Sequence, residues 1–219
     1  MTETKRIMLV DDHVIFRQSL KMLLETHTDY KVCWDVGDVQ SAIEQLQVVK
    51  PDLLIVDISL KGVSGLTLTA AVREKCPDIP VLILSMYSEN VYAERAFQMG
   101  AKGYIMKNAA MEELLTAVKT VMNGRIFASE FVKDQVLLSF SKTSRGNRTK
   151  KASDSLTDRE LEILHLLGQG RKTRQIASIL KVSPKTIDSH CMNIKTKLNL
   201  RDSGALMEYA VLWHYGREW

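Results

Sequence analysis

Cysteine is scarce in this sequence of 219 residues, and its scarcity excludes two kinds of site. The three cysteines, Cys33, Cys76 and Cys191, lie far apart, and none of them forms a CxxC pair. A disulfide framework or a thiolate zinc site needs paired or closely spaced thiols. We therefore expect all three cysteines to be reduced and structural.

Long hydrophobic runs are also missing. No apolar run approaches the roughly 20 residues that a helix needs to cross a bilayer. The chain opens on the polar stretch "MTETKR" and not on the apolar segment of a cleaved signal peptide. These features predict a cytoplasmic protein without a membrane segment.

Charge is distributed unevenly between the two halves of the chain. Residues 1–124 hold 13 Lys and Arg against 16 Asp and Glu, for a net charge of −3. Residues 125–219 hold 17 against 10, for a net charge of +7. The C-terminal half alone is therefore suited to binding a polyanion such as nucleic acid.

The first half alternates short apolar runs with segments of helical spacing. Five runs read as strands, and they are "RIMLV", "KVCWDVG", "DLLIV", "VLILS" and "GYIMK". Five segments between and after them read as helices, at residues 14–25, 42–49, 66–72, 93–99 and 114–122. This alternation predicts a doubly wound α/β domain over residues 1–124, with a five-stranded parallel sheet covered on both faces.

A change in composition separates this half from the rest. Residues 141–155 read "SKTSRGNRTKKASDS", which is polar and basic and is typical of a flexible linker. We assign residues 125–153 to a linker with a possible short helix, and residues 154–219 to an all-α domain of four helices. In the first of these helices, Thr157 and Glu160 have the spacing of a capping box, while Ser183 and Pro184 open the third.

Polar side chains stand at the ends of four predicted strands. Asp11 and Asp12 end the first strand, Asp57 the third, Ser85 the fourth and Lys107 the fifth. The carboxyl ends of parallel strands are where such sheets place their sites, so we expect these side chains to converge. Carboxylate oxygens with water are the usual ligands of Mg²⁺, and a carboxylate can accept a phosphoryl group. We therefore interpret Asp57 as a nucleophile beside Mg²⁺. Taken singly, each of these residues would also suit an ordinary turn.

Four motifs now resemble one known family. They are "LVDDH" at 9–13, "VDISLKGVSG" at 56–65, "LILSMY" at 82–87 and "GAKGYIMK" at 100–107. The half that holds them resembles the receiver domain of bacterial two-component response regulators. The chain as a whole is similar to the subfamily with a C-terminal LuxR-type (NarL/FixJ-like) helix-turn-helix, over essentially its full length.

The resemblance implies a flavodoxin-like receiver with defined residue roles. A sensor histidine kinase would phosphorylate Asp57, and Asp11, Asp12 and the Ser59 backbone carbonyl would hold Mg²⁺ together with Asp57. Lys107 and Ser85 would bind the phosphoryl group, and Tyr104 matches the aromatic position that swings inward on activation. The family usually has proline four residues after the phosphorylated Asp, where this chain has Lys61, and that departure bears on the lifetime of the phosphoryl group.

The basic half carries a candidate DNA-binding helix. Residues 171–201 contain eight bases and a single acid, Asp188. Wound at 3.6 residues per turn, residues 184–199 place Ile187, Cys191, Ile194 and Leu198 on one stripe that faces the core. A short helix, a tight turn and a longer helix with a polar outer face form the helix-turn-helix arrangement. The segment "SPKTIDSHCMNIKTKLNL" also resembles the LuxR-type recognition helix. Predicted contacts to double-stranded DNA are Lys172, Lys185, Thr186, Asp188, Ser189, His190, Met192, Lys195 and Lys197.

Three functions fit these features. The first is a transcription factor that pairs as a homodimer when Asp57 is phosphorylated. The second is an aspartyl-phosphate enzyme of the haloacid dehalogenase type, although Ser59 stands where such enzymes typically have a general-acid Asp. The third is a DNA-binding protein whose receiver only dimerises and needs no phosphoryl group.

Overall fold

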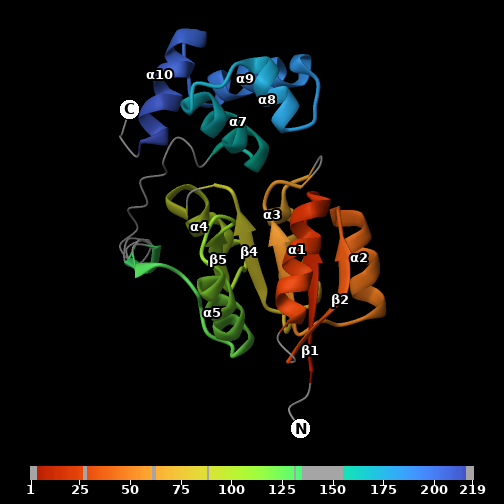
Figure 1. The fold of residues 1–219 in the computed structure, drawn as a ribbon. Helices are drawn as coiled ribbons and strands as arrows, with labels where there is room; N and C mark the ends of the chain where they lie inside the picture. Colours follow the sequence, from red (N-terminus) through yellow and green to blue (C-terminus); the bar gives the residue numbers. More distant parts are fainter. Residues whose placement is uncertain are drawn as a thin grey trace. The chain divides into compact units, whose positions relative to one another are not determined.

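In the computed structural model of the chain, the described residues are 4–26, 29–60, 63–87, 89–130, 132–134 and 155–215. They belong to two compact units, one within Met1–Arg145 and one within Gly146–Trp219 (Figure 1). Lys61 and nearly all of the basic segment 141–155 lie outside the described residues. Each unit is considered by itself below.

The first unit is built on a five-stranded parallel sheet in the order β2-β1-β3-β4-β5. Its strands are β1 (Lys5–Val10), β2 (Tyr30–Val36), β3 (Leu53–Asp57), β4 (Val81–Ser85) and β5 (Gly103–Met106). Every residue of β3 and β4 is buried, which explains why these strands read as continuous apolar runs and not as alternating ones. The doubly wound sheet predicted from the sequence is confirmed.

Helices cover both faces of this sheet (Figure 1). They are α1 (Val14–Glu25), α2 (Val39–Val48), α3 (Gly65–Lys75), α4 (Glu89–Gln98) and α5 (Met111–Met122). Leu24 of α1 and Val118 of α5 belong to one apolar cluster with Ile7, Leu53 and Leu84, so α1 and α5 share a face of the sheet. Polar caps set where two of the helices begin. Asp38 accepts a hydrogen bond from the Ser41 backbone before α2, and Ser64 accepts one from Leu66 before α3.

The chain returns to the sheet after α5. Gly103 and Phe127 form a parallel bridge, in which Tyr104 donates to the Phe127 carbonyl (3.2 Å) and Phe127 donates to the Lys102 carbonyl (2.9 Å). A Cβ on Gly103 would lie 2.7 Å from a Leu82 methyl carbon, so glycine is what permits this close packing. The predicted linker therefore begins with residues that pair with β5.

The second unit contains four helices among its described residues. They are α7 (Asp158–Gly168), α8 (Thr173–Ile179), α9 (Pro184–Lys197) and α10 (Ser203–His214). Thr157 and Glu160 form the predicted capping box of α7, and Ser183 caps α9 with Pro184 in its first turn. Lys181 adopts a positive φ of 54° in the turn between α8 and α9, which allows the abrupt change of direction.

Among the residues described, no helix combines the length and the apolar character that crossing a bilayer requires.

Candidate functional site

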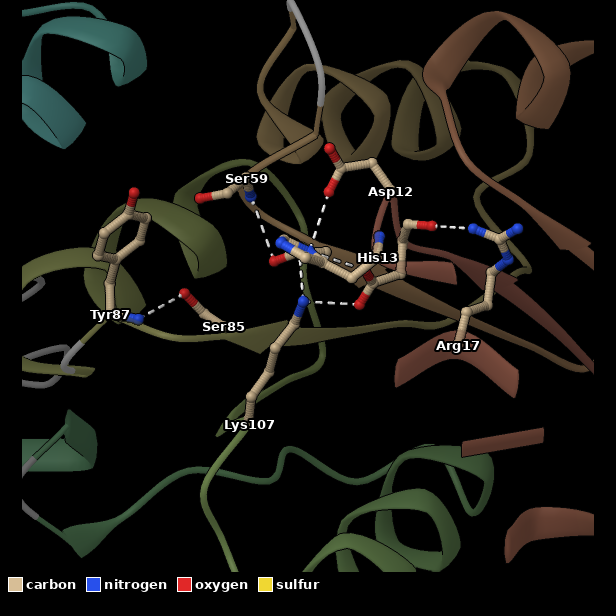
Figure 2. Close-up of polar contacts among 9 residues, drawn as sticks. Asp12, His13, Arg17, Ser59, Ser85, Tyr87 and Lys107 are labelled. Atoms are coloured by element: carbon tan, nitrogen blue, oxygen red, sulfur yellow. Dashed lines mark hydrogen bonds and ion pairs between the residues drawn. The ribbon is translucent and has the colours of Figure 1, made fainter. Parts of the chain in front are cut away.

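The sheet order brings the predicted polar residues to one edge. Asp57 and Ser85 are the last residues of β3 and β4, while Asp11 and Lys107 directly follow β1 and β5. These four strands are neighbours in the sheet, so their carboxyl ends meet in one place. Figure 2 shows the resulting group, with Asp12, Ser59, Ser85 and Lys107 arranged around its centre.

Lys107 is the cation at the centre of this group. Its Nζ lies 2.6 Å from Asp11 Oδ2 and 2.6 Å from Asp57 Oδ2. The Lys107 side chain is 4 % exposed and that of Asp57 is 2 % exposed, so these contacts are shielded from water. Shielding makes each ion pair stronger than a surface pair, and it also makes an uncompensated charge expensive. Phe16 lies beneath the ammonium group, with its ring centre 4.7 Å from Nζ.

The Asp57 carboxyl group experiences opposing influences. Burial raises its pKa, Lys107 lowers it, the neighbouring Asp11 raises it, and the Ser59 backbone N–H, which donates to Oδ1 over 3.2 Å, lowers it. The net result is a pKa above the ordinary Asp value. A single lysine therefore does not fully compensate the buried acids, and a further cation would favour their ionised form.

Three aromatic residues lie next to Ser85. The Ser85 hydroxyl accepts a hydrogen bond from the Tyr87 backbone N–H (3.0 Å; Figure 2), and the Tyr104 hydroxyl donates to the Tyr87 carbonyl (2.8 Å). Tyr87 stacks on Tyr92 with ring centres 4.9 Å apart. Tyr104 is 2 % exposed, so its ring already points inward in this structure, and burial raises its pKa.

Two residues at the site were missed by the sequence analysis. His13 follows Asp12 directly, and its Nδ1 lies 3.0 Å from Asp12 Oδ1. Arg17 reaches across from the first turns of α1, where its guanidinium donates to the Asp11 carbonyl (Figure 2). Its Nε also donates to Asp35 over 3.4 Å. The motif "DDH" could have identified His13, whereas nothing in the sequence indicates the contact of Arg17.

The group has the composition of a metal site. Asp11, Asp12, His13 and Asp57 each offer one ligand atom, and these four atoms lie within 4.8 Å of one another. Three of the four donors are carboxylates, and Lys107 contacts two of them, Asp11 and Asp57. Carboxylate-rich donor sets of this kind suit a hard divalent cation.

A close backbone approach fixes Asp57 from the other side. Gly65, the first residue of α3, donates its backbone N–H to the Ile58 carbonyl over 2.8 Å. A Cβ added to Gly65 would lie 2.0 Å from the Asp57 carbonyl oxygen. The start of α3 therefore rests directly on the residue that carries the central carboxylate, and this contact admits no side chain.

In the second unit, α9 divides into a core face and an outer face. Ile187 and Ile194 are fully buried, while Cys191 and Leu198 are only partly buried, so the predicted core stripe is deepest at its centre. The remaining candidates have these positions: Lys172, Lys185, Asp188, Ser189, Met192 and Lys197 are exposed, and Thr186, His190 and Lys195 are partly exposed. The outer face predicted from the helical winding is therefore accessible.

Lys197 has a partner inside its own domain. Its Nζ lies 2.7 Å from Oε2 of Glu160, whose side chain is 3 % exposed. Burial raises the pKa of Glu160, but hydrogen bonds from Lys197 and Thr157 outweigh this and bring the pKa below its ordinary value. His190 lies in the same environment, where burial lowers its pKa. A predicted DNA contact, Lys197, thus also joins α9 to α7.

Two histidines, His165 and His214, pack together between α7 and α10. His165 is 4 % exposed, its ring centre lies 4.8 Å from that of His214, and Gln169 lies 3.0 Å from its Nε2. Burial, reinforced by the nearby His214, lowers the pKa of His165 from 6.5 to about 4. His165 is therefore neutral in the folded domain near pH 7.

The two units match two known families. Residues 7–119 match the response regulator receiver domain, and residues 154–210 match the bacterial regulatory proteins of the luxR family. A curated relative is the oxygen regulatory protein NreC of Staphylococcus epidermidis, which is 36% identical over 210 residues, or 94% of this chain and 96% of that protein.

Two solved structures extend this comparison. A two-component response regulator of the LuxR family from Aurantimonas sp. SI85-9A1 is 30% identical, with a TM-score of 0.58 over 64% of this chain and 99% of that one. RcsB from Salmonella enterica serovar Typhimurium, solved on the promoter rprA with the phosphomimetic BeF3-, is 23% identical. Its TM-score is 0.59 over 95% of this chain and 99% of that one, and at this identity it shows a shared fold alone.

Proposed function

The chain belongs to the two-component response regulators with a LuxR-type DNA-binding domain, and from this membership we propose that phosphorylation of Asp57 controls its binding to promoter DNA. Proteins of this family are transcription factors and not enzymes that turn over a substrate. The alternative of an aspartyl-phosphate enzyme of the haloacid dehalogenase type is therefore set aside. A receiver domain implies a kinase partner, which we take to be a sensor histidine kinase.

The observation that carries the proposal is the position of Asp57. It is the innermost of the acids, 2 % exposed, and it lies within contact distance of Lys107. We propose that one Asp57 carboxylate oxygen forms a bond to phosphorus while the bond from phosphorus to the leaving group of the donor breaks. Lys107 Nζ then binds a phosphoryl oxygen. Ser85, whose oxygen accepts from the Tyr87 backbone N–H, would turn its hydroxyl proton to a second phosphoryl oxygen.

Magnesium fits the donor set of this site. Three carboxylates against one lysine leave an excess of negative charge, and carboxylate oxygens are the ligands that Mg²⁺ prefers. Asp11, Asp12 and Asp57, with the backbone carbonyl of Ser59, would hold the ion. When bound, it would neutralise negative charge on the carboxylates and on the incoming phosphoryl group. Arg17 supports this arrangement, because it fixes the backbone that carries Asp11 and Asp12.

We further propose how the DNA-binding domain acts. Helix α9 enters the major groove, where its outer face meets the bases and its flank approaches phosphates. The outer face carries Lys185, Asp188, Ser189, Met192 and Lys195, and the phosphate contacts are Lys172, Thr186, His190 and Lys197. Phosphorylated receivers pair as a homodimer and set two copies of α9 about one DNA turn apart, roughly 34 Å. Tyr104, buried beside Ser85, would take part in the change of receiver surface that promotes pairing.

The domain limits and the location of the protein also remain proposals. We assign residues 1–124 to the receiver, 125–153 to the linker and 154–219 to the DNA-binding domain, and we retain a cytoplasmic location.

The deciding experiment compares the wild type with Asp57→Asn, with acetyl phosphate and Mg²⁺ present or absent. Exposed Asp78→Asn serves as the control. We expect the phosphodonor to add the mass of one phosphoryl group and to tighten a DNA footprint in the wild type and the control, and to do neither in Asp57→Asn. Equal DNA affinity under all conditions would favour the alternative hypothesis, in which the receiver only dimerises and DNA binding needs no phosphoryl group.

A separate pair of variants tests the DNA face. Lys172→Gln should weaken binding to all sequences and reduce the slope of log affinity against log salt concentration by about one. Met192→Ala should instead change the base preference, because Met192 is 61% exposed on the outer face of α9. A footprint that neither variant alters would refute the assignment of this face.

A further inference from the structure

His13 lies at the acidic site, and the proposed function gives it no role. Its side chain is 55 % exposed and closes the site from the solvent side, with the ring directed at the carboxylates (Figure 2). Nδ1 lies 3.0 Å from Asp12 Oδ1, 3.3 Å from Asp11 Oδ1 and 3.9 Å from Asp57 Oδ2. The His13 backbone N–H also donates to Asp11 Oδ1 over 2.8 Å, which holds the loop with the ring beside that carboxylate.

These distances are those expected between ligands of a single ion. Two ligands at right angles, each about 2.1 Å from a metal, are about 3.0 Å apart, and two opposite ligands are about 4.2 Å apart. The distances from His13 to Asp12 and Asp11 are close to the first value, and the distance to Asp57 approaches the second. The imidazole nitrogen therefore lies where a further ligand would lie.

At Asp11, Lys107 and His13 approach different carboxylate oxygens. Lys107 contacts Oδ2 of Asp11, whereas His13 is directed at Oδ1 of that residue. An ion held between His13, Asp12 Oδ1 and Asp11 Oδ1 thus leaves the pairing of Lys107 with Asp11 intact. At Asp57 the two residues approach the same oxygen, Lys107 at 2.6 Å and His13 at 3.9 Å, so Lys107 is the closer partner there.

Nitrogen changes which ions the site prefers. Mg²⁺ is bound by oxygen and gains little from imidazole, whereas imidazole is a good ligand of first-row transition metals. We propose that His13 is a metal ligand, and that it makes this receiver bind first-row transition-metal ions more tightly than Mg²⁺. This inference rests on the metal site of the proposed function and adds a ligand that determines its specificity.

The test uses Mn²⁺ as the probe and the full-length protein. Pulsed electron paramagnetic resonance of bound Mn²⁺ detects coupling to a directly bound nitrogen. We expect this coupling in the wild type and in the control His214→Gln, which removes a histidine from the second unit, and we expect its loss in His13→Gln. Titration calorimetry should show that His13→Gln lowers the affinity for Mn²⁺ at least about tenfold, by analogy with the loss of supporting residues at metal sites, and that the Mg²⁺ affinity is unchanged.

The possible outcomes distinguish a failure of the His13 inference from a failure of the proposed metal site. If Mn²⁺ binds to the wild type without nitrogen coupling, His13 merely hydrogen-bonds to Asp12 and the inference is wrong, while the oxygen site stands. If no Mn²⁺ binds, the metal site itself is refuted, and the inference with it. Labelling the histidines with ¹⁵N changes the coupling without any substitution, so the test does not depend on the folding of the variant.

Discussion

The contact between Gly65 and Asp57 leads to a strong prediction, because it leaves no room for even one methyl group. In Gly65→Ala the new Cβ would lie 2.0 Å from the Asp57 carbonyl oxygen and 2.8 Å from Val56 Cγ1. Real Cβ atoms essentially never approach a heavy atom within 3.0 Å, so α3 and the end of β3 must separate by about 1 Å. We expect the Asp57 carboxylate to move with its backbone, away from Lys107.

The expected effects follow from that displacement. Overpacking of a buried contact costs about 1–3 kcal/mol, and this site should lie at the upper end because the clash is with backbone. Misplacement of a reacting group by about 1 Å lowers a rate on the order of 100-fold. Gly65→Ala should therefore lose about 3 kcal/mol of unfolding free energy, at that upper limit, and most of its phosphorylation rate.

Urea unfolding and phosphorylation by acetyl phosphate, followed by mass measurement, provide the two readouts. Gly37→Ala is the matched control, since it makes the same substitution at the same edge of the sheet. There the nearest atom to the new Cβ, a guanidinium nitrogen of Arg17, lies 3.5 Å away, which is ordinary contact. If Gly65→Ala were as stable and as readily phosphorylated as Gly37→Ala, the reasoning about this contact would be wrong.

Three further predictions concern buried charges. Lys107→Met removes the buried cation and should cost about 3–5 kcal/mol in EDTA, with partial recovery on adding Mg²⁺, as measured by urea unfolding; equal stability with and without the lysine would contradict this. Lys197→Met leaves Glu160 without its cation and should cost about 1–3 kcal/mol in thermal unfolding; a loss of DNA affinity with unchanged stability would instead assign Lys197 to DNA alone. Because the pKa of His165 is lowered to about 4, the unfolded chain binds a proton more readily than the folded one, so the second unit should lose stability as pH falls from 6.5 towards 4. Hydrogen exchange of α7 checks this, and His165→Gln should flatten the pH dependence.

The strands were predictable because they are short, buried apolar runs, whereas the starts of α2 and α3 were not. Apolar spacing placed α2 at 42–49 and α3 at 66–72, whereas they begin at Val39 and Gly65. In both cases the helix begins directly after a polar cap, Asp38 or Ser64, and the first turn contributes little to the apolar pattern. Spacing of apolar residues locates the interior of a helix, while hydrogen bonds to the first backbone N–H groups determine its start.

The candidate site shows the same division. Topology alone brings the ends of parallel strands together, so Asp11, Asp57, Ser85 and Lys107 could be found in the sequence. The guanidinium of Arg17 joins this group through a backbone carbonyl, and no residue pattern encodes such a contact.

The ion pair of Lys197 with Glu160 likewise spans 37 residues and depends on how α7 packs on α9. Helical winding correctly placed Lys197 beside the outer face of α9, but it could not reveal this buried partner.

The bridge between Gly103 and Phe127 has a practical consequence for dissecting the protein. A fragment that stops at residue 124 would contain every strand of the receiver. It would nevertheless lack Phe127, whose backbone forms hydrogen bonds with the outer edge of β5. The unpaired N–H and C=O groups of an exposed edge strand can pair with another chain, so such a fragment should self-associate in a way the intact protein does not. Oligomers observed with a shortened receiver would then be a result of the truncation and not of phosphorylation.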